Sequence, residues 1–326
     1  MTRTCPLSLE NMWNARFLSV KEKEETEIKA TKWYKASKKQ QAMAQLLQEL
    51  QMIGTRFHLV VVEKRFMIAG WAVNTFFDYA NVGSDDRSFV NDCGKRRAVA
   101  DYYEQHCTDA EMTIVGEALR KPTREDYLRA IHVLQSHAPE QSCNDILVCA
   151  EQNVDGLLVE EVTPTGTFNE SVFHSPNLTA LAALGNMIAC MCKVENAQTS
   201  FVYDDCSLCN SAYHELFKIY SGIESDFKIP SIPMHYTWKD RVLSLCTAKS
   251  QDVPLLQAAD ILATCTDKVM QKVGKGAKDF TTFESSILMQ LRQTFGEDHL
   301  WIVTSQKLKQ CFINSMSSAF LDDSRQ

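Results

Sequence analysis

The sequence has no apolar run close to the length that crosses a lipid bilayer. A transmembrane helix needs about 20 consecutive apolar residues, and polar or charged side chains interrupt every apolar stretch here before that length. The start, MTRTCPLSLENMWNARF, also has no continuous apolar segment of a secretory signal. We therefore expect a soluble protein with no membrane partner, localised in the cytoplasm.

The cysteines lack the spacing of a disulfide-stabilised secreted domain. The chain has 12 of them, scattered without short loops, so reduced thiols are the expected state. Basic residues are outnumbered as well: 34 Lys and Arg stand against 41 Asp and Glu, which gives a formal net charge of −7. This balance opposes non-specific binding to nucleic acid, which needs many cationic contacts to phosphate. Local basic patches still allow nucleic acid as a partner.

What the chain does contain is enough apolar material for a substantial core. Hydrophobic residues make up 45% of its 326 residues, and a chain of this length forms one large domain or two ordinary ones. We find no internal repeat and no low-complexity tract. The prediction is a single α/β domain over residues 1–326.

The first half alternates helix, strand and helix and then becomes helical throughout. Apolar residues recur at helical spacing over 43–50, and Gly54 stands where a helix would end. RFHLVVVEKRF, with its β-branched run, predicts a strand, and MIAGWAVNTFFDYA predicts an apolar helix. Residues 84–153 are predicted to form a helical insertion, in which Thr123 and Asp126 resemble a capping box.

The second half contains two further predicted strands. GLLVEEVTPTGTFNESVFH predicts a hairpin or an ordered loop. Ser175 and Pro176 then start a helix that is apolar almost all round and should be buried. SFVY is a continuous apolar run, which predicts a strand covered on both faces. Another strand is expected within PMHYTWKDRVLSLC, and a helix is expected from Pro254.

Two acids, Asp204 and Asp205, follow the SFVY strand directly. Ligands of open α/β sheets collect beyond the carboxyl ends of the strands, so acids at this position are informative. Neighbouring strand residues point to opposite faces, so only one of the two readily faces a given site. We favour Asp204 as a ligand. The alternative is that the pair only caps the next helix and forms the turn.

A third acid, Asp260, lies in the helix PLLQAADILATCTDKVM. Its polar residues Gln257, Asp260, Thr264 and Asp267 recur along one stripe. The plain interpretation of such a stripe is a solvated helix face. Asp260, however, has small apolar neighbours that indicate close packing against a sheet, where a carboxylate needs a partner or a cation.

Carboxylates that are brought together repel one another, and a bound divalent cation removes that penalty. Hard oxygen ligands suit Mg²⁺ or Mn²⁺, and such ions support the hydrolysis of phosphodiesters. The hypothesis is a metal site held by Asp204 and Asp260. Lys64 and Arg65, at the end of VVVEKRF, are candidates to contact substrate phosphate, with an ordinary solvated strand end as the alternative.

The order EIK, VVVEKRF, SPNLTALA, FVYDDCSLCNSAYHELF and VPLLQAADILAT resembles a prokaryotic and phage family known as domain of unknown function 3800. The resemblance spans about Glu27 to Met270. It implies an RNase H-like fold, with a mixed sheet flanked by helices and a helical insertion. It also implies an active site that contains the acids Asp204 and Asp260, with Asp205, Gln257 and Glu27 as weaker candidates.

One part of the family pattern is missing. Family members begin with a strand that ends in Asp-Glu-Ser-Gly and supplies the first metal-binding acid, and nothing before Glu27 matches it. We expect that this N-terminal strand of the core is absent, through truncation or through loss. Two functions follow: a Mg²⁺- or Mn²⁺-dependent nuclease, or an inactive RNase H-like binding or scaffold protein. An open edge beside SFVY would also favour pairing with a second protomer, which makes a homo-oligomer an expectation.

Overall fold

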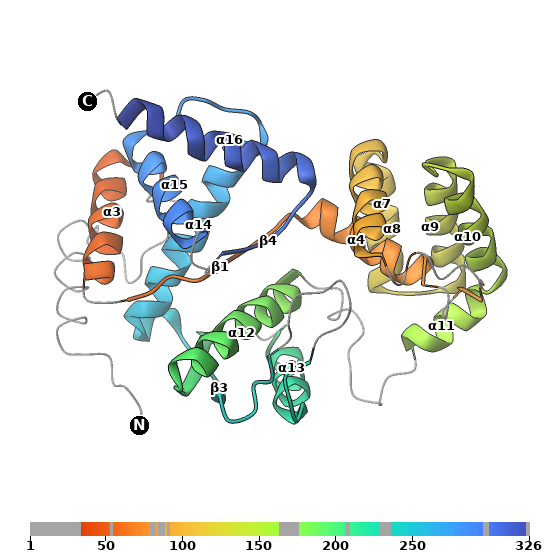
Figure 1. The fold of residues 1–326 in the computed structure, drawn as a ribbon, viewed down its shortest axis with the longest axis horizontal. Coiled ribbons are helices and arrows are strands. Elements are labelled where there is room, and N and C mark those ends of the chain that lie inside the picture. The colour runs from red at the N-terminus through yellow and green to blue at the C-terminus, as the bar shows by residue number, and fades with distance from the viewer. Residues whose placement is uncertain are drawn as a thin grey trace.

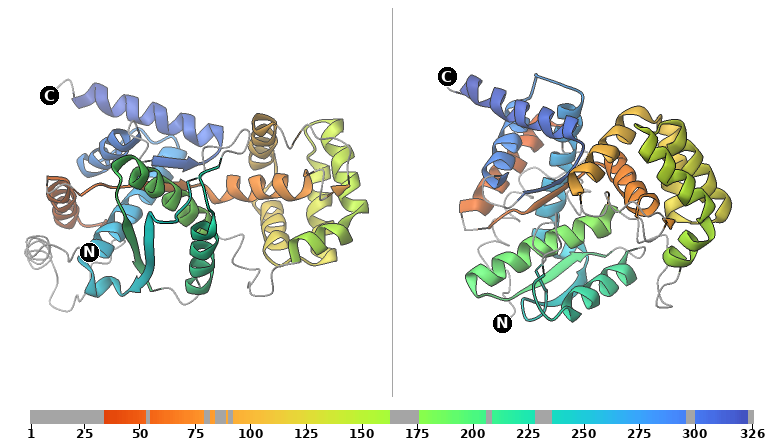
Figure 2. Two further views of the ribbon diagram at one scale, coloured as in Figure 1. Left: turned by 60° about the horizontal axis from the view of Figure 1, so that its bottom comes forward. Right: turned by 45° about the vertical axis from the view of Figure 1, so that its right-hand side comes forward.

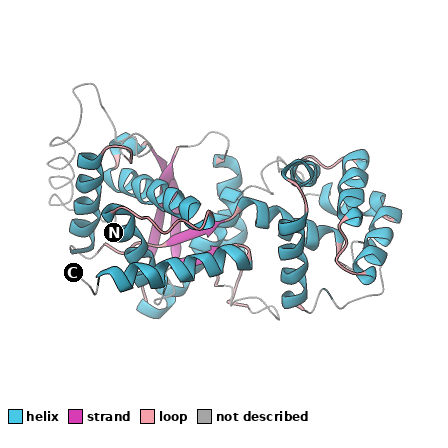
Figure 3. Ribbon diagram, turned by 90° about the horizontal axis from the view of Figure 1, so that it is seen from above, coloured by secondary structure: helices cyan, strands magenta, loops and turns pink. Residues whose placement is uncertain are grey.

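The molecule is built mostly from helices, with two small parallel sheets among them (Figure 1, Figure 3). This arrangement confirms the α/β class in its loose sense. The structure is a computed structural model and describes residues 34–52, 55–78, 82–83, 89, 92–162, 176–205, 209–227, 236–295 and 300–323.

The three strands that the sequence predicts occur in the expected order, and a fourth follows them near the end of the chain. The helices of the first half are α3 (Ser37–Met52), α4 (Lys64–Phe76), α7 (Cys93–His106), α8 (Asp109–Arg120), α9 (Arg124–Ser136), α10 (Gln141–Gln152) and α11 (Val154–Val162). Those of the second half are α12 (Pro176–Glu195), α13 (Asn210–Gly222), the short η2 (Ser250–Asp252), α14 (Pro254–Gly274), α15 (Thr282–Phe295) and α16 (Gln306–Asp323). The strands are β1 (Leu59–Val62), β2 (Thr199–Asp204), β3 (Val242–Ala248) and β4 (Leu300–Val303).

Both sheets pair their strands in parallel. β1 lies beside β4 from the pair Leu59 and Leu300 to the pair Val62 and Val303, and β2 lies beside β3. Parallel neighbours need a crossover connection; α13 lies in the one between β2 and β3, whereas β1 and β4 are joined by most of the chain. In each sheet the carboxyl ends of both strands therefore emerge at the same edge.

The prediction that β2 is covered on both faces is wrong. Its exposure alternates along the strand, and Val202 is 47% exposed while Phe201 and Tyr203 are half-buried. Among the described strands β2 pairs with β3 alone, so this small sheet buries only the face that packs on Trp238. A short apolar run such as SFVY does not distinguish these two environments.

Helices α4 and α7 to α11, here called the helical lobe, gather on one side of the molecule (Figure 1). They share a hydrophobic core of their own, and the predicted helical character of residues 84–153 is confirmed for its described part. Thr123 caps α9 as expected: its Oγ1 accepts from the backbone N–H of Asp126 at 3.1 Å and donates to the Asp126 carboxylate at 2.7 Å. The hairpin or loop predicted from Gly156 is wrong over 156–162, which continue as α11; the rest of that segment lies outside the described residues.

Helix α12 begins at Pro176, as predicted, but it is less buried than its composition indicates. The window Asn177–Glu195 has a mean hydropathy of 1.3, and 39% of it is buried. By length and composition this one helix of the described residues could cross a membrane. In the structure it lies against α13 and β1 (Figure 2).

Trp238 is the centre of the core beneath the sheet of β2 and β3. Its side chain is fully buried, stacks on Tyr220 with 4.9 Å between ring centroids and meets Phe201 of β2 edge-on. Gly185 of α12 provides the space, because a Cβ at that position would lie 1.9 Å from Cζ2 of Trp238. This packing holds β2, and with it Asp204, against α12.

We predict that Gly185→Ala destabilises the protein, because the added methyl group displaces Trp238. Overpacking costs roughly 1–3 kcal/mol, against a gain of up to about 1 kcal/mol from the higher helix propensity of alanine. Urea unfolding measures the net loss. Gly70→Ala in α4 is the matched control: no atom lies within 4 Å of its added Cβ, so it should be neutral or stabilising. Equal effects of the two changes would contradict this account.

Asp226 joins α12 to the segment that precedes β3. Its carboxylate accepts from Nη1 and Nη2 of Arg241, from Nζ of Lys193 at 2.8 Å and from the backbone N–H of Thr237 at 2.9 Å. The side chain is only 13% exposed. The hydrogen bonds from Arg241, supported by those from Lys193 and Thr237, hold the pKa of Asp226 well below its usual range.

We predict that Asp226→Asn lowers the free energy of unfolding at neutral pH by roughly 3 kcal/mol, since it leaves a largely buried Arg241 without its counter-charge. A carboxylate with a lowered folded-state pKa stabilises the fold fully above its unfolded pKa of about 4, and this contribution is lost as the pH falls below that value. The difference between wild type and variant should therefore shrink in acid. Denaturant unfolding at a series of pH values checks this, and a constant difference would contradict it.

Candidate functional site

Asp204 and Asp205 lie at the carboxyl end of β2 and each makes an intramolecular hydrogen bond. The carboxylate of Asp204 accepts from the backbone N–H of Ser250 at 2.9 Å, at the start of η2. The carboxylate of Asp205 accepts from Nδ2 of Asn210 at 2.9 Å, at the start of α13. Both side chains are exposed. Asp204 thus reaches η2, which follows β3, and Asp205 bonds the side chain of Asn210, so the alternative that the pair caps the next helix is not confirmed. Asp204 keeps a second carboxylate oxygen.

Asp260 lies in the first half of α14, which contacts both β2 and η2. It is exposed, whereas Gln257, about one turn earlier, is only 6% exposed. The polar stripe predicted for α14 is thus divided between core and surface. Burial, together with the negative charge of Asp260, raises the pKa of the Cys265 thiol to about 12, so this buried cysteine is not a nucleophile at neutral pH.

The structure does not bring a full set of metal ligands together in the described part of the chain. Among those residues no group of three or more His, Cys, Asp or Glu side chains is placed to hold a metal ion. Glu27, the weakest of the candidate acids, lies outside the described residues. A metal at Asp204 and Asp260 would therefore depend on those two carboxylates, with water or substrate oxygens completing its coordination.

The two basic candidates lie at the start of α4 and differ in their surroundings. Lys64 is exposed. Arg65 is engaged within the protein: its Nε donates to the carbonyl of Glu104 at 2.7 Å, and its Nη atoms donate to the carbonyl of Cys107 and the carboxylate of Asp109. Arg65 thus holds the end of α7 to the start of α4, which leaves Lys64 as the more accessible cation for a phosphate.

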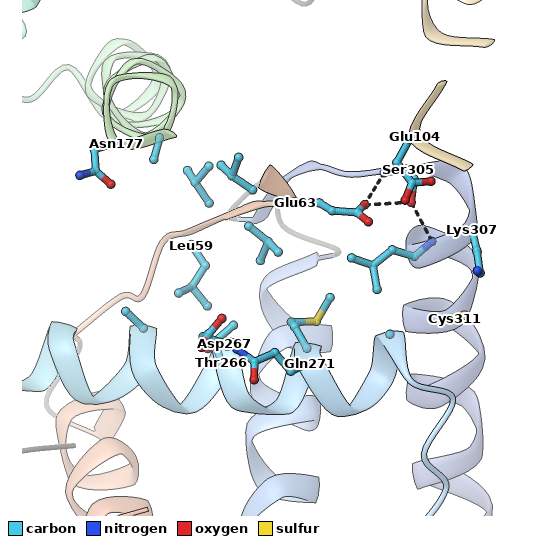
Figure 4. A pocket seen from close by; sticks show the side chains of 18 residues that line it. Leu59, Glu63, Glu104, Asn177, Thr266, Asp267, Gln271, Ser305, Lys307 and Cys311 are labelled. Carbon is cyan, nitrogen blue, oxygen red and sulfur yellow. Dashed lines mark hydrogen bonds between the residues drawn. The ribbon is translucent and has the colours of Figure 1, made fainter. Parts of the chain in front are cut away.

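A cavity of about 570 Å³ lies along β1, from Leu59 to Glu63, and is bordered by α7, α12, α14 and α16. Figure 4 shows its lining: β1 and the side chains of Met270 and Leu308 are apolar, and the charged groups are Glu63, Glu104, Asp267 and Lys307. One end of the cavity, at Glu63 and Ser305, lies at the carboxyl edge of the sheet, where ligands of parallel α/β sheets bind. Its volume is in the range of small-molecule sites, roughly 300–1,000 Å³.

Glu63 is fixed at this edge by Ser305. Its carboxylate accepts from the backbone N–H of Ser305 at 2.7 Å and from its Oγ at 2.8 Å, and the two residues are 242 positions apart in the sequence. The backbone N–H of Glu63 donates to the carbonyl of Val303 at 2.9 Å. Parallel pairing thus continues one residue beyond the strands and orients the carboxylate.

Glu104 projects from α7 into the same place (Figure 4). Its side chain is 12% exposed, and its Oε1 lies 3.5 Å from Nε of Arg65. Its other oxygen, Oε2, is buried without a hydrogen-bond partner in the part of the chain that the structure describes. Burial, and then the negative charge of Glu63, raises the pKa of Glu104. The two carboxylates form an acidic pair at one end of the cavity.

The sequence contained a signal for one member of this pair. Glu63 follows the run VVV directly, so the rule that selected Asp204, an acid immediately after an apolar strand, also selects Glu63. Glu104 carries no such signal, because it lies within a helix of the lobe and reaches the cavity only through tertiary packing.

Comparisons of the chain with family models, with curated proteins and with solved structures give no match. The resemblance to the domain of unknown function 3800 family therefore stays a prediction.

We predict that Glu104→Gln makes the protein more stable relative to wild type as the pH rises. A carboxyl whose folded-state pKa is raised stabilises the fold below its unfolded pKa, and this contribution is lost as the pH rises through the folded pKa. Glutamine keeps the shape and removes the charge. Melting temperatures of wild type and variant at about pH 4 and about pH 7.5 measure the change, with Glu125→Gln on the exposed face of α9 as control. A difference that does not vary with pH would contradict the prediction.

Proposed function

We propose that the chain is an RNase H-like, nuclease-like protein that hydrolyses phosphodiesters with Mg²⁺ or Mn²⁺. The observation that carries the proposal is the placement of Asp204 at the carboxyl end of a parallel strand that contacts α14, the helix bearing Asp260. The RNase H-like arrangement and the place in the domain of unknown function 3800 family are parts of the same proposal. They rest on the sequence resemblance and on this local geometry.

The residues at this edge fit a hard divalent cation. Asp204 and Asp260 are exposed carboxylates, and the bond from Ser250 occupies one oxygen of Asp204 and leaves the other. When bound, Mg²⁺ or Mn²⁺ would supply charge stabilisation and an activated water. In the proposal Asp205, Gln257 and Glu27 support these ligands, and Lys64, with Arg65 beside it, contacts the phosphate of a nucleic acid substrate in the cytoplasm.

A second function is favoured by a specific observation. Asp204 has a structural hydrogen bond to Ser250 at the start of η2, and Asp205 has one to Asn210 at the start of α13. No three-ligand group occurs among the described residues. These acids would serve the same architectural role in a binding or scaffold protein with no catalytic activity. Among the described strands β2 pairs with β3 alone, so in such a protein a second protomer would pair with the open edge of β2 and cover Val202 and Leu243, which are 47% and 55% exposed.

The metal prediction distinguishes the two functions. Mn²⁺ or Mg²⁺ at millimolar concentration should raise the melting temperature, because a ligand present at 100 times its dissociation constant adds about 2.7 kcal/mol to the stability of the native state. At roughly 2–4 °C per kcal/mol, the rise should be several degrees. Asp204→Asn and Asp260→Asn should abolish it, together with any Mn²⁺-dependent cleavage of DNA or RNA. Asp145→Asn, an exposed acid on α10, is the control. An unchanged melting curve in wild type would favour the scaffold function.

A further inference from the structure

The cavity beside β1 has a strong imbalance of charge. Three carboxylates line it, from Glu63, Glu104 and Asp267, and one ammonium, from Lys307. Two further cations lie outside the lining, Arg65 at 3.5 Å from Glu104 and Lys268 at 3.6 Å from Asp267. Lys307 is exposed to solvent. Neither Asp204 nor Asp260 lines this cavity, so it is a different place from the proposed metal site.

Two buried polar atoms belong to residues of the lining and have no hydrogen-bond partner among the described residues. One is Oε2 of Glu104 and the other is Oγ1 of Thr266, a residue that is only 5% exposed. An unpaired buried polar group costs about 1–3 kcal/mol, and more if it is charged. A ligand that donates hydrogen bonds to these two oxygens would recover that free energy.

The acidic groups lie at two separate poles. Glu63 and Glu104 are at one end of the cavity, while Asp267 lies beside Thr266 on α14, well apart from them (Figure 4). The rest of the lining includes apolar side chains of β1, Met270 and Leu308, together with the amides of Asn177 and Gln271. Each pole thus combines negative charge with a buried hydrogen-bond acceptor, and the apolar side chains of the lining favour hydrocarbon.

We propose that this cavity binds a linear aliphatic diamine or short polyamine, with one ammonium group between Glu63 and Glu104 and the other beside Asp267 and Thr266. One ammonium donates to Oε2 of Glu104 and the other to Oγ1 of Thr266, which have no partner among the described residues, and the positive charges offset the carboxylates of the lining. The methylene chain covers the aliphatic wall and removes it from water, at about 25 cal/mol per Å² of buried apolar area.

Other small ligands fit the lining less well. An anion would be repelled by three carboxylates against one ammonium. A bare divalent ion would use neither the aliphatic wall nor the volume of about 570 Å³. A neutral apolar molecule would leave the oxygens of Glu104 and Thr266 unpaired. Only an organic cation with a flexible apolar body uses all three features.

Isothermal titration of the whole chain at near-physiological salt tests the proposal, since salt suppresses non-specific attraction to a protein of net charge −7. The probes are diaminobutane, spermidine, butylamine, butanediol and MgCl₂. We expect one site per chain, with the diamine bound at least tenfold more tightly than the monoamine. No measurable binding of butanediol is expected, nor competition by Mg²⁺.

The variants separate the two poles. Glu104→Gln should weaken the diamine at least tenfold, and its melting temperature, measured under the titration conditions, separates this loss from unfolding. Asp267→Asn should reduce the affinity for the diamine and leave that for butylamine unchanged. Lys307→Gln should tighten the binding of both amines, since it removes the competing charge. Asp145→Asn should change nothing.

Three results would overturn the proposal: no saturable binding of either amine, equal affinities for diamine and butanediol, or a diamine affinity that Glu104→Gln leaves unchanged. Preferential binding of Mg²⁺ in the cavity, lost in Glu104→Gln but not in Asp204→Asn, would replace the amine with a metal and would equally refute it. The metal proposal at Asp204 and Asp260 is tested by other variants, so the failure of one proposal does not decide the other.

Discussion

The parallel pairing of β1 with β4 is the constraint on which the rest of the structure depends. It joins residues 59–62 to residues 300–303, so the chain between them must leave this sheet and return to it. The entropic cost of closing a loop grows only slowly with its length. The core formed by α3, α14, α15 and α16, which packs against β1, provides apolar burial against that cost. Once the two strands pair, Glu63 and Ser305 lie side by side at the end of the sheet, and β1 forms one wall of the cavity.

The helical lobe takes its position from the same edge. α4 begins two residues after β1 ends, and α7 returns to the end of β4: Nη2 of Arg97 donates to the carbonyl of Thr304 at 2.6 Å, and Asp101 accepts from the backbone N–H of Gln306 at 2.8 Å. These bonds bring Glu104 beside Glu63. The segment that the sequence presents as an insertion therefore forms part of a cavity wall, which gives it a role in any ligand binding at this edge.

In the sheet of β2 and β3, residues at the carboxyl end of a strand again bond to the segments that follow. Asp204 reaches the start of η2 and Asp205 reaches the start of α13. Such bonds are compatible with a metal site, since a carboxylate has two oxygens. They are equally compatible with a purely structural role for Asp204 and Asp205. The packing of Trp238 against Gly185 and the ion pair of Asp226 with Arg241 also stabilise this unit.

Local sequence determined most of the helices, the strands β1, β2 and β3 and several of their ends, because these depend on interactions between residues a few positions apart. Thr123 with Asp126, Pro176 and the run VVV all act within one turn or one strand. The acids after β1 and β2 could be selected in the same way. Only the tertiary structure decided how strands distant in sequence pair, why Val202 faces solvent, and that Arg65 is held within the protein while Glu104 meets Glu63. The physical reason is that strand pairing, burial and the distances between charged groups depend on which distant segments pack together. The periodicity of residues along the chain does not specify that packing.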